Sequence, residues 1–215
     1  MPYDQFSHVT DWVFDLDHTL YPASDSLFIQ LEVRMEAYLM RELSLDAAQA
    51  KSLRHDYWHE HGTTLAGMMH HHGTDPVAFL DEVQDIDFSC LTPNPLLGEA
   101  IKKLPGRKIV YTNGSSEYAL KATTALGINT AFDALYGIDH ANYVSKPHKI
   151  AFDRVFGDIN LKTNNAAMFE DDPRNLAVPH DMGLKTVLVG VNHDAEHIHH
   201  KTNDLTAFLI SIINR

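Results

Sequence analysis

Short apolar runs and longer stretches of helical periodicity alternate along most of the chain. The runs are rich in β-branched and aromatic residues, as buried strands are, and they predict strands at residues 12–14, 108–111, 134–136, 166–169 and 186–189. Helical spacing predicts helices at residues 116–126, at 149–156, in a segment running through 176, and at 205–213. Strands that alternate with helices lie parallel, because each connection must cross the sheet. The pattern therefore predicts an α/β fold with a doubly wound, mostly parallel sheet.

Residues 21–91 interrupt this alternation. Apolar residues recur there at helical spacing, namely Leu27, Leu31, Met35, Tyr38 and Leu39, after a possible cap at Asp25 or Ser26. Residues 46–57 and 75–83 are typical of further helices, and residues 62–64 and 70–73 break the pattern between them. Pro93 and Pro95 mark a boundary. We therefore expect residues 21–91 to form an inserted α-helical cap on a core made of residues 1–20 and 92–215.

The composition is that of an ordinary globular protein, with 215 residues, 44% hydrophobic and 21% charged. No apolar stretch is long enough to cross a bilayer, and residues 1–5 lack the pattern of a signal peptide. A single cysteine, Cys90, excludes an internal disulfide framework. The net charge of −12 disfavours nucleic-acid polymers and anionic membranes as partners. We expect a cytoplasmic protein, a monomer or homodimer, that acts on a small molecule.

Two aspartates, Asp15 and Asp17, follow the first predicted strand. In extended backbone, residues two positions apart point the same way, so the two carboxylates aim into one small volume. Like charges held that close raise each other's pKa unless a cation neutralises them. The pair indicates a site for a divalent metal, a phosphoryl group or both, although aspartate is also common in ordinary turns.

Polar residues also follow other predicted strands, at the sheet edge where ligands of doubly wound folds bind. They are Thr112, Asn113 and Gly114 after the second strand, Glu170, Asp171, Asp172 and Asn175 after the fourth, and Lys146 before the fourth. A carboxylate can attack phosphorus, and a second carboxylate can transfer protons. Mg²⁺ prefers oxygen ligands, and a lysine can offset negative charge. Taken alone, Lys146 would be a surface lysine, and Thr112 could simply cap the next helix.

In order and spacing, these residues resemble the haloacid dehalogenase-like (HAD) hydrolase superfamily over essentially the whole chain. The resemblance implies a Rossmann-like core in which Asp15 is the nucleophile and Asp17 is the general acid/base. It also implies that the Asp17 backbone carbonyl binds the metal. Catalytic or phosphate-binding roles follow for Thr112, Asn113, Gly114 and Lys146.

The acidic residues after the fourth strand resemble the metal-binding motif of the same superfamily. Glu170 and Asp171 match the motif, with Asn175 in a supporting position, and the implied cofactor is Mg²⁺ bound by Asp15, Asp17 and Asp171. Three acids stand where two are usual, so Asp172 remains a rival of Asp171 as the direct ligand.

The insert is similar to the helical cap of the first HAD subclass, and several short motifs resemble the pyrimidine 5′-nucleotidase branch. These motifs are residues 15–22, 62–65, 85–87 and 169–176. The resemblance implies a Mg²⁺-dependent phosphatase that hydrolyses a pyrimidine nucleoside monophosphate, with His59, Thr63 and Thr64 as candidate substrate contacts. Phosphoglycolate or sugar phosphates are alternative substrates. A phosphomutase, a 2-haloacid dehalogenase and a receiver-type phospho-acceptor module are alternative classes.

The remaining reactive side chains give weaker indications of a function. The chain has 15 histidines, including the run of residues 70–72, and His193 and His197 have the spacing of a helical ligand pair. No cysteine or convergent acid accompanies that pair, so metal binding there would be adventitious. Tyr57 and Trp58 are expected in the core of the cap, or alternatively in a base-binding pocket. Cys90 has no catalytic surroundings and is expected to be a bystander.

Overall fold

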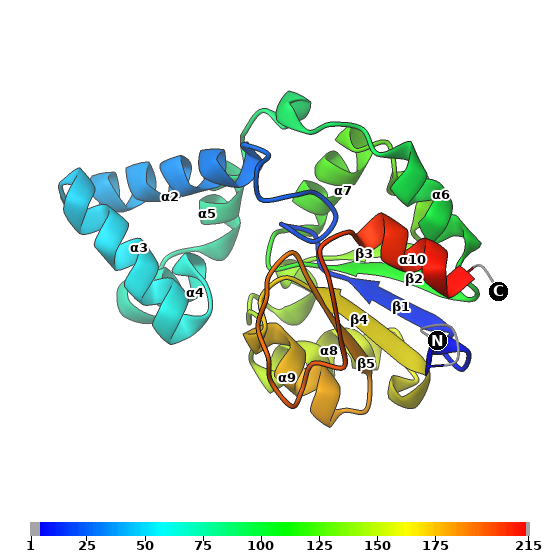
Figure 1. Cartoon of the computed structure of the whole chain (residues 1–215). Helices are drawn as coiled ribbons and strands as arrows, with labels where there is room; N and C mark the ends of the chain where they lie inside the picture. The colour runs from blue at the N-terminus through cyan, green and yellow to red at the C-terminus, as the bar shows by residue number, and fades with distance from the viewer. Residues whose placement is uncertain (1–4, 214–215) are drawn as a thin grey trace.

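A computed structural model describes residues 5–213, and Figure 1 shows a twisted sheet with helices on both faces and a helical arm beside it. The strands are β1 (Asp11–Phe14), β2 (Arg107–Tyr111), β3 (Ala134–Tyr136), β4 (Ala166–Glu170), β5 (Lys185–Val189) and β6 (His200–Thr202). Their order is β3-β2-β1-β4-β5-β6, and every pair is parallel. The predicted α/β doubly wound sheet is confirmed.

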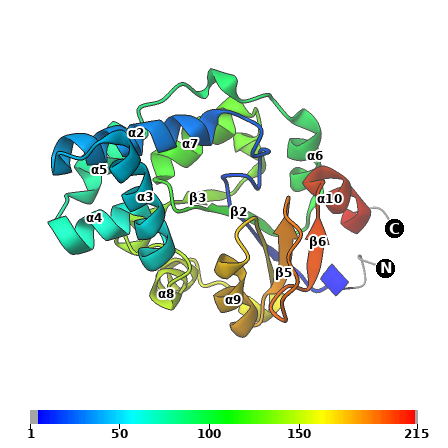
Figure 2. The same ribbon diagram turned by 60° about the vertical axis from the view of Figure 1, so that its left-hand side comes forward.

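All five predicted strands are present, each within two residues of its expected bounds. β6, at the edge next to β5, was not predicted (Figure 2). Its sequence, His-Lys-Thr, has no apolar residue, and its three side chains are partly or fully exposed, so it lacks the pattern that marks a strand.

Two apolar layers fix the helices against the sheet. Side chains of Trp12 and Phe14 in β1 pack with α6 (Pro95–Lys103), α7 (Ser116–Ala125) and α10 (Leu205–Ile213). Val13, which points to the opposite face, packs with α8 (Lys149–Asp158) and α9 (Arg174–Asp181). Each crossover returns the chain to the same sheet edge, so the carboxyl ends of β1, β2 and β4 lie side by side.

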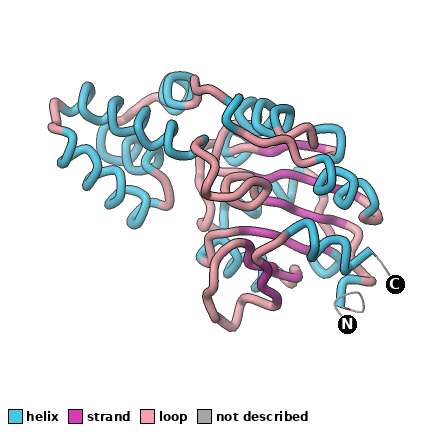
Figure 3. The backbone as a smooth tube through the Cα atoms, turned by 45° about the horizontal axis from the view of Figure 1, so that its top comes forward, coloured by secondary structure: helices cyan, strands magenta, loops and turns pink. Residues whose placement is uncertain are grey.

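Four helices between β1 and α6 pack together to one side of the sheet (Figures 1 and 3), and we call residues 27–83 the cap. They are α2 (Leu27–Leu43), α3 (Ala47–His61), α4 (Thr64–His72) and α5 (Pro76–Val83), followed by the short turn η1 (Phe88–Cys90). The segment is helical as expected. The division into domains 21–91 and 1–20 with 92–215 stays a prediction, and residues 1–4 and 214–215 lie outside the described part.

Helix ends in and near the cap correct several expectations. Residues 62–64 and 70–73 were expected to break the pattern, but α4 extends over Thr64–His72 and so includes part of both segments. The Thr63 hydroxyl caps this helix by accepting a hydrogen bond from the Ala66 backbone N–H. α6 was missed because Pro95, taken as a boundary, occupies its first turn. Ser26 occupies the cap position of α2 but makes no side-chain capping hydrogen bond. Among the described residues, no helix is long and apolar enough to cross a membrane.

Candidate active site

Side chains from the core and the cap line one cavity of 780 Å³. It opens at the carboxyl ends of β1, β2 and β4, where the order of the strands reverses. Hydrogen bonds extend the sheet into the site, since the Asp15 N–H donates to the Phe169 carbonyl and the Thr112 N–H donates to the Tyr136 carbonyl. The cavity brings together every catalytic, metal and phosphate residue predicted from the sequence: Asp15, Asp17, Thr112, Asn113, Gly114, Lys146, Glu170, Asp171 and Asn175.

Lys146 lies at the centre of the polar cluster and is 1% exposed. Its ammonium group donates to Asp15 Oδ1 and to Glu170 Oε2, both at 2.7 Å, and to the Tyr111 carbonyl at 3.1 Å. Asn113 holds the backbone of the lysine from both sides, because its Oδ1 accepts from the Lys146 N–H and its Nδ2 donates to the Lys146 carbonyl. The lysine is therefore fixed at both ends against the nucleophile candidate.

Burial and charge shift the pKa values of this cluster. Burial raises the pKa of Asp15 to about 6, against the opposing effect of Lys146. Burial also raises the pKa of Glu170 well above its usual value, and the neighbouring Asp15 adds to the shift. For Lys146, burial favours the neutral amine, but the two carboxylates outweigh it and raise its pKa. Lys146 is therefore a permanent cation beside Asp15.

The carboxylates around Lys146 suit a divalent cation. Ligand oxygens of Asp15, Glu170 and Asp171 lie within 4.8 Å of one another. When ionised, three carboxylates and one ammonium leave two negative charges, which match Mg²⁺. Asn175 lines the same cavity, and its Oδ1 is buried and has no hydrogen-bond partner among the described residues. An unpaired buried oxygen is costly unless a ligand satisfies it, so the residues present fit the metal.

Asp172, the rival metal ligand, is engaged elsewhere. Its Oδ1 accepts from the Arg174 backbone N–H, and its Oδ2 lies 2.6 Å from the guanidinium of the same arginine. The guanidinium in turn covers the ring of Trp58 on the cap at 3.8 Å. This geometry favours Asp171 over Asp172 as the direct ligand.

The side chain of Asp17 contacts two tyrosines, neither of which was among the predicted site residues. Its Oδ1 accepts hydrogen bonds from the hydroxyl of Tyr118, at 2.6 Å, and from the hydroxyl of Tyr21. Burial raises the pKa of Asp17, and the two hydroxyls oppose that rise. A half-buried carboxyl with a raised pKa is suited to carry a proton in one step and release it in another.

His18 is a further residue that the sequence did not mark. It follows Asp17 with a positive φ of 62°, lines the cavity, and its Nδ1 lies 3.5 Å from Asp171 Oδ2. The contact with Asp171 raises its pKa. Its only sequence signal was its position next to the aspartate pair.

The phosphate-binding candidates after β2 form a tight turn. The Thr112 hydroxyl accepts from the Gly114 N–H at 3.0 Å, and Thr112 is 1% exposed. A Cβ on Gly114 would meet the Tyr118 ring at 2.6 Å, so this position requires glycine. Ser115, rather than Thr112, caps α7 through the Tyr118 N–H. Thr112 is therefore not needed as a helix cap.

The cap contributes a different set of residues from the one expected. Thr63 and Thr64 line the cavity, whereas His59 is exposed and lies outside the lining. His55 and Trp58 take its place, because one turn of α3 separates them and His59 is rotated by about 100° from Trp58. The expectation for His59 is thus corrected. Tyr57 is buried in the cap, as predicted, but Trp58 is 41% exposed and faces the cavity.

Of the other candidates raised by the sequence, His193 lines the active-site cavity, whereas His197 and Cys90 do not. His193 and His197 fall in a segment without helix, so the helical spacing assumed for a ligand pair does not exist. His197 Nε2 instead contacts the Pro173 carbonyl at 2.9 Å. Cys90, in η1, lies outside the cavity lining and contacts the Asp87 carbonyl.

Comparison with known proteins agrees with this geometry. A profile of the haloacid dehalogenase-like hydrolases matches residues 13–183. The chain belongs to this family. Phosphate metabolism protein 8 of Saccharomyces cerevisiae is 25% identical over 195 residues, which is 81% of this chain and 60% of the yeast protein. The chain therefore spans less than two thirds of that relative.

Solved HAD structures share the fold. A HAD phosphatase from Thermococcus onnurineus superposes with a TM-score of 0.63 at 15% identity, covering 96% of this chain and 98% of the other. The magnesium-bound YfnB protein of Bacillus subtilis gives 0.62 at 15% identity, over 96% and 99%. L-2-haloacid dehalogenase from Xanthobacter autotrophicus gives 0.54 at 18% identity, over 86% and 79%. These HAD hydrolases include both phosphatases and dehalogenases, so the fold alone does not choose the reaction.

Proposed function

We propose that the protein is a Mg²⁺-dependent phosphatase that hydrolyses a small phosphate monoester through an aspartyl-phosphate. One observation carries the proposal: Asp15 is held beside a buried lysine and two further carboxylates, while Asp17 is held separately by two hydroxyls. A dehalogenase needs a nucleophile but neither a metal nor an acid for the leaving group. The extra acids and the positioned Asp17 therefore favour phosphoryl transfer.

The reaction divides into two steps between the two aspartates. A carboxylate oxygen of Asp15 attacks phosphorus, the bond from phosphorus to the ester oxygen breaks, and Asp17 gives its proton to that leaving oxygen. In the second step Asp17 removes a proton from water, the water oxygen attacks phosphorus, and the acyl phosphate bond breaks to release phosphate and restore Asp15. Asp17 therefore regains from water the proton that it gave to the leaving group, and is ready for the next cycle.

Other residues hold the phosphoryl group and its charge. Lys146 and the Thr112–Gly114 turn lie on the same cavity wall as Asp15 and supply positive charge and hydrogen-bond donors to the phosphoryl oxygens. Bound between Asp15, Asp171 and the Asp17 carbonyl, with Glu170 and Asn175 in support, Mg²⁺ would neutralise charge on the nucleophile and phosphate. Cap residues form part of the cavity wall and limit access of water to the site.

The cap side of the cavity supports a nucleoside monophosphate as substrate. Its lining combines an exposed indole, Trp58, with His55, Phe28 and the two threonines Thr63 and Thr64. Aromatic faces stack on bases, and hydroxyls can bind polar groups on a sugar or base. A pyrimidine nucleoside 5′-monophosphate, as the short motifs imply, is our first choice, and the yeast relative's name also refers to phosphate metabolism.

Phosphate release tests this function. Purified protein is assayed on nucleoside monophosphates, phosphoglycolate, sugar phosphates and 2-haloacids, with EDTA and then with excess Mg²⁺. We expect activity on a phosphate ester that EDTA abolishes and Mg²⁺ restores, and an Asp15→Asn variant that is folded but inactive. Preference for another phosphate ester would replace the nucleotide and keep the chemistry. Metal-independent halide release, or full activity in Asp15→Asn, would overturn the proposal.

A further inference from the structure

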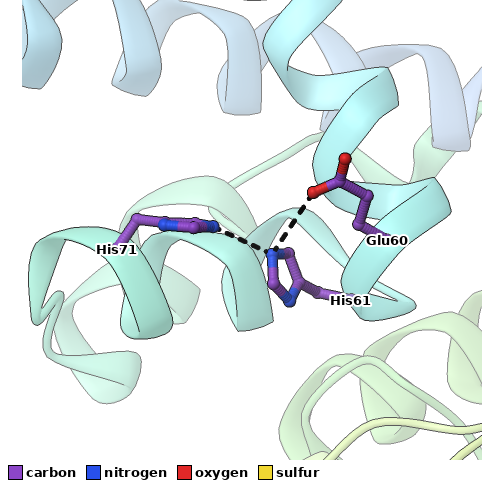
Figure 4. A group of neighbouring side chains, drawn as sticks. All are labelled: Glu60, His61 and His71. Carbon is purple, nitrogen blue, oxygen red and sulfur yellow. Dashed lines mark hydrogen bonds and ion pairs between the residues drawn. The ribbon is translucent and has the colours of Figure 1, made fainter.

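A second group of potential metal ligands lies in the cap, outside the active-site cavity. Figure 4 shows Glu60 and His61, at the end of α3, facing His71 on α4. His61 Nε2 lies 3.0 Å from His71 Nε2 and 3.9 Å from Glu60 Oε2, and one ligand atom from each residue falls within a 4.8 Å cluster. None of the three lines the active-site cavity.

The packing of α3 on α4 creates this group. Gly67 touches Tyr57 so closely that a Cβ there would lie 2.2 Å from the tyrosine ring, so the two helices approach at van der Waals contact. The Tyr57 ring stacks on His71, with centres 5.3 Å apart and planes 12° apart, and its hydroxyl contacts His72 Nε2 at 2.7 Å. A buried tyrosine thus orients the His71 ring toward His61.

The distance between the two imidazole nitrogens fits a shared metal ion. Two nitrogens each about 2.05 Å from a tetrahedral ion stand roughly 3.3 Å apart, close to the 3.0 Å between these Nε2 atoms. Glu60 is 65% exposed, so its side chain is free to move the short distance needed to become a third ligand. Two imidazoles and one carboxylate favour Zn²⁺ and similar transition metals, whereas an all-oxygen site favours Mg²⁺.

We propose that Glu60, His61 and His71 form a binding site for a divalent transition metal of the Zn²⁺ class, separate from the catalytic Mg²⁺ site. The ion would take three protein ligands and water, and it would join the end of α3 to the end of α4. Without an ion, the two histidines form only a hydrogen bond between their rings. The inference does not depend on the reaction that the active site catalyses.

The proposed site lies next to a contact between cap and core. The Ser145 hydroxyl donates to the carbonyl of His61 at 3.2 Å. The next residue, Gly62, has φ of +86°, and a Cβ there would lie 2.8 Å from the Lys146 carbonyl. An ion bound at His61 would therefore stiffen the part of the cap that touches the backbone of the active-site lysine.

Calorimetric titration with Zn²⁺ tests the site, using full-length protein without a histidine tag, stripped of metal and then saturated with Mg²⁺. His71→Gln removes one exposed ligand, and Glu60→Gln removes the carboxylate without altering either ring. His59→Gln is the matched control, because His59 is an exposed histidine of the same helix, about 200° around the axis from His61. Cobalt absorption, measured in parallel, reports nitrogen ligation and tetrahedral geometry.

We expect one Zn²⁺ per wild-type chain to bind at this site, with affinity at least roughly tenfold lower in His71→Gln and in Glu60→Gln and unchanged in His59→Gln. Zn²⁺ should raise the melting temperature of the wild type more than that of His71→Gln, because only ligand bound to the native state stabilises it. The same stoichiometry and affinity in His71→Gln as in the wild type would overturn the proposal. So would an absence of Zn²⁺ binding to the Mg²⁺-saturated protein, since any Zn²⁺ bound only without Mg²⁺ would occupy the catalytic site.

Discussion

The guanidinium of Arg174 lies 3.8 Å from the centre of the Trp58 ring, and this contact joins the core to the cap beside the active-site cavity. Arg174 begins α9, and Trp58 lies on α3. The ion pair with Asp172 holds the guanidinium in place, so the indole rests on a positioned cation. A cation–π contact at a partly exposed site contributes about 0.5–1 kcal/mol, which is enough to bias the position of a cap.

Replacing Trp58 tests whether its ring contributes to substrate binding, through its contact with Arg174 or by stacking on the substrate. In Trp58→Ala we expect KM for a phosphate ester to rise several-fold while kcat falls less, because the ring takes no part in the chemistry. Trp58→Phe retains an aromatic face and should lie near the wild type. Steady-state kinetics of the two variants decides the matter, and an unchanged KM in Trp58→Ala would show that the contact is incidental.

Substitution of Asp171 and substitution of Asp172 should have different effects, although the two residues are adjacent. Asp171→Asn removes a carboxylate from the cluster with Asp15 and Glu170, so we expect a much higher Mg²⁺ concentration for half-maximal activity. Asp172→Asn loosens Arg174 and should raise KM for the substrate, with little change in the Mg²⁺ requirement. Activity measured against Mg²⁺ concentration separates the two variants, and the reverse result would make Asp172 the direct ligand.

Lys146 is expected to support both the reaction and the fold. Lys146→Met leaves Asp15 and Glu170 buried without their shared cation. Losing one partner of a buried ion pair costs about 3–5 kcal/mol, so the free energy of unfolding should fall by an amount of that order. The loss of charge at the phosphoryl group should lower kcat by about 100-fold or more.

Denaturant titration and kcat measurements on folded protein check the two effects of Lys146→Met. The exposed Lys149→Met, three residues away, is the control, because it removes a surface ion pair with Asp153 that contributes little. A Lys146→Met variant as stable and active as this control would contradict the central role given to the lysine.

The sequence predicted the sheet and the position of the site because both depend on local patterns. Asp15 and Glu170 follow apolar strands directly, and parallel strands place such residues at one edge. Strand β6 and helix α4 were missed for a related reason: β6 has no apolar residue, and α4 is a short helix that ends in three histidines. Where the sequence lacks a periodic pattern of apolar residues, tertiary contacts determine the secondary structure.

Local sequence patterns could not predict contacts between residues that are far apart in the sequence. Tyr118 meets Asp17 across 101 positions of sequence, and only the packing of α7 on the sheet brings the two together. Likewise, helical spacing alone does not show which face of α3 turns to the cavity, so His59 was named as a substrate contact, His55 was not, and Trp58 was given only as an alternative. The polar residues that directly follow the strands were therefore predictable one by one, whereas the Tyr118 contact and the face of α3 that turns to the cavity were not.

Tyr118 should affect the chemical step. Tyr118→Phe keeps the ring in the core but removes the hydroxyl that donates to Asp17. A hydrogen bond to a charged group contributes about 1.5–3 kcal/mol, so we expect kcat to fall by about tenfold or more with little change in KM. Tyr111→Phe is the control, since its buried hydroxyl has no partner among the described residues. Equal kinetics in the two variants would remove Tyr118 from the positioning of Asp17.

His199 should make the stability of the fold sensitive to pH. Its Nδ1 accepts a hydrogen bond from the Thr186 N–H at 3.1 Å, which only the ring without a proton on that nitrogen can do. Partial desolvation lowers the pKa of the exposed His199 in the folded protein, and the nearby Lys185 adds to the shift. The unfolded chain therefore takes up a proton at a higher pH than the folded one. The contribution of His199 is present above about pH 6.5 and is lost as the pH falls toward the lower folded value.

His199→Asn removes the titration but keeps an acceptor, because the amide Oδ1 can replace Nδ1 opposite Thr186. We expect its melting temperature to fall less than that of the wild type when the pH is lowered from about 7.5 to about 5.5. His200, whose pKa burial also lowers, stays in the variant, so part of the wild-type slope should persist. Thermal unfolding at several pH values measures both slopes, and equal slopes would mean that the Thr186 contact does not depend on the charge of His199.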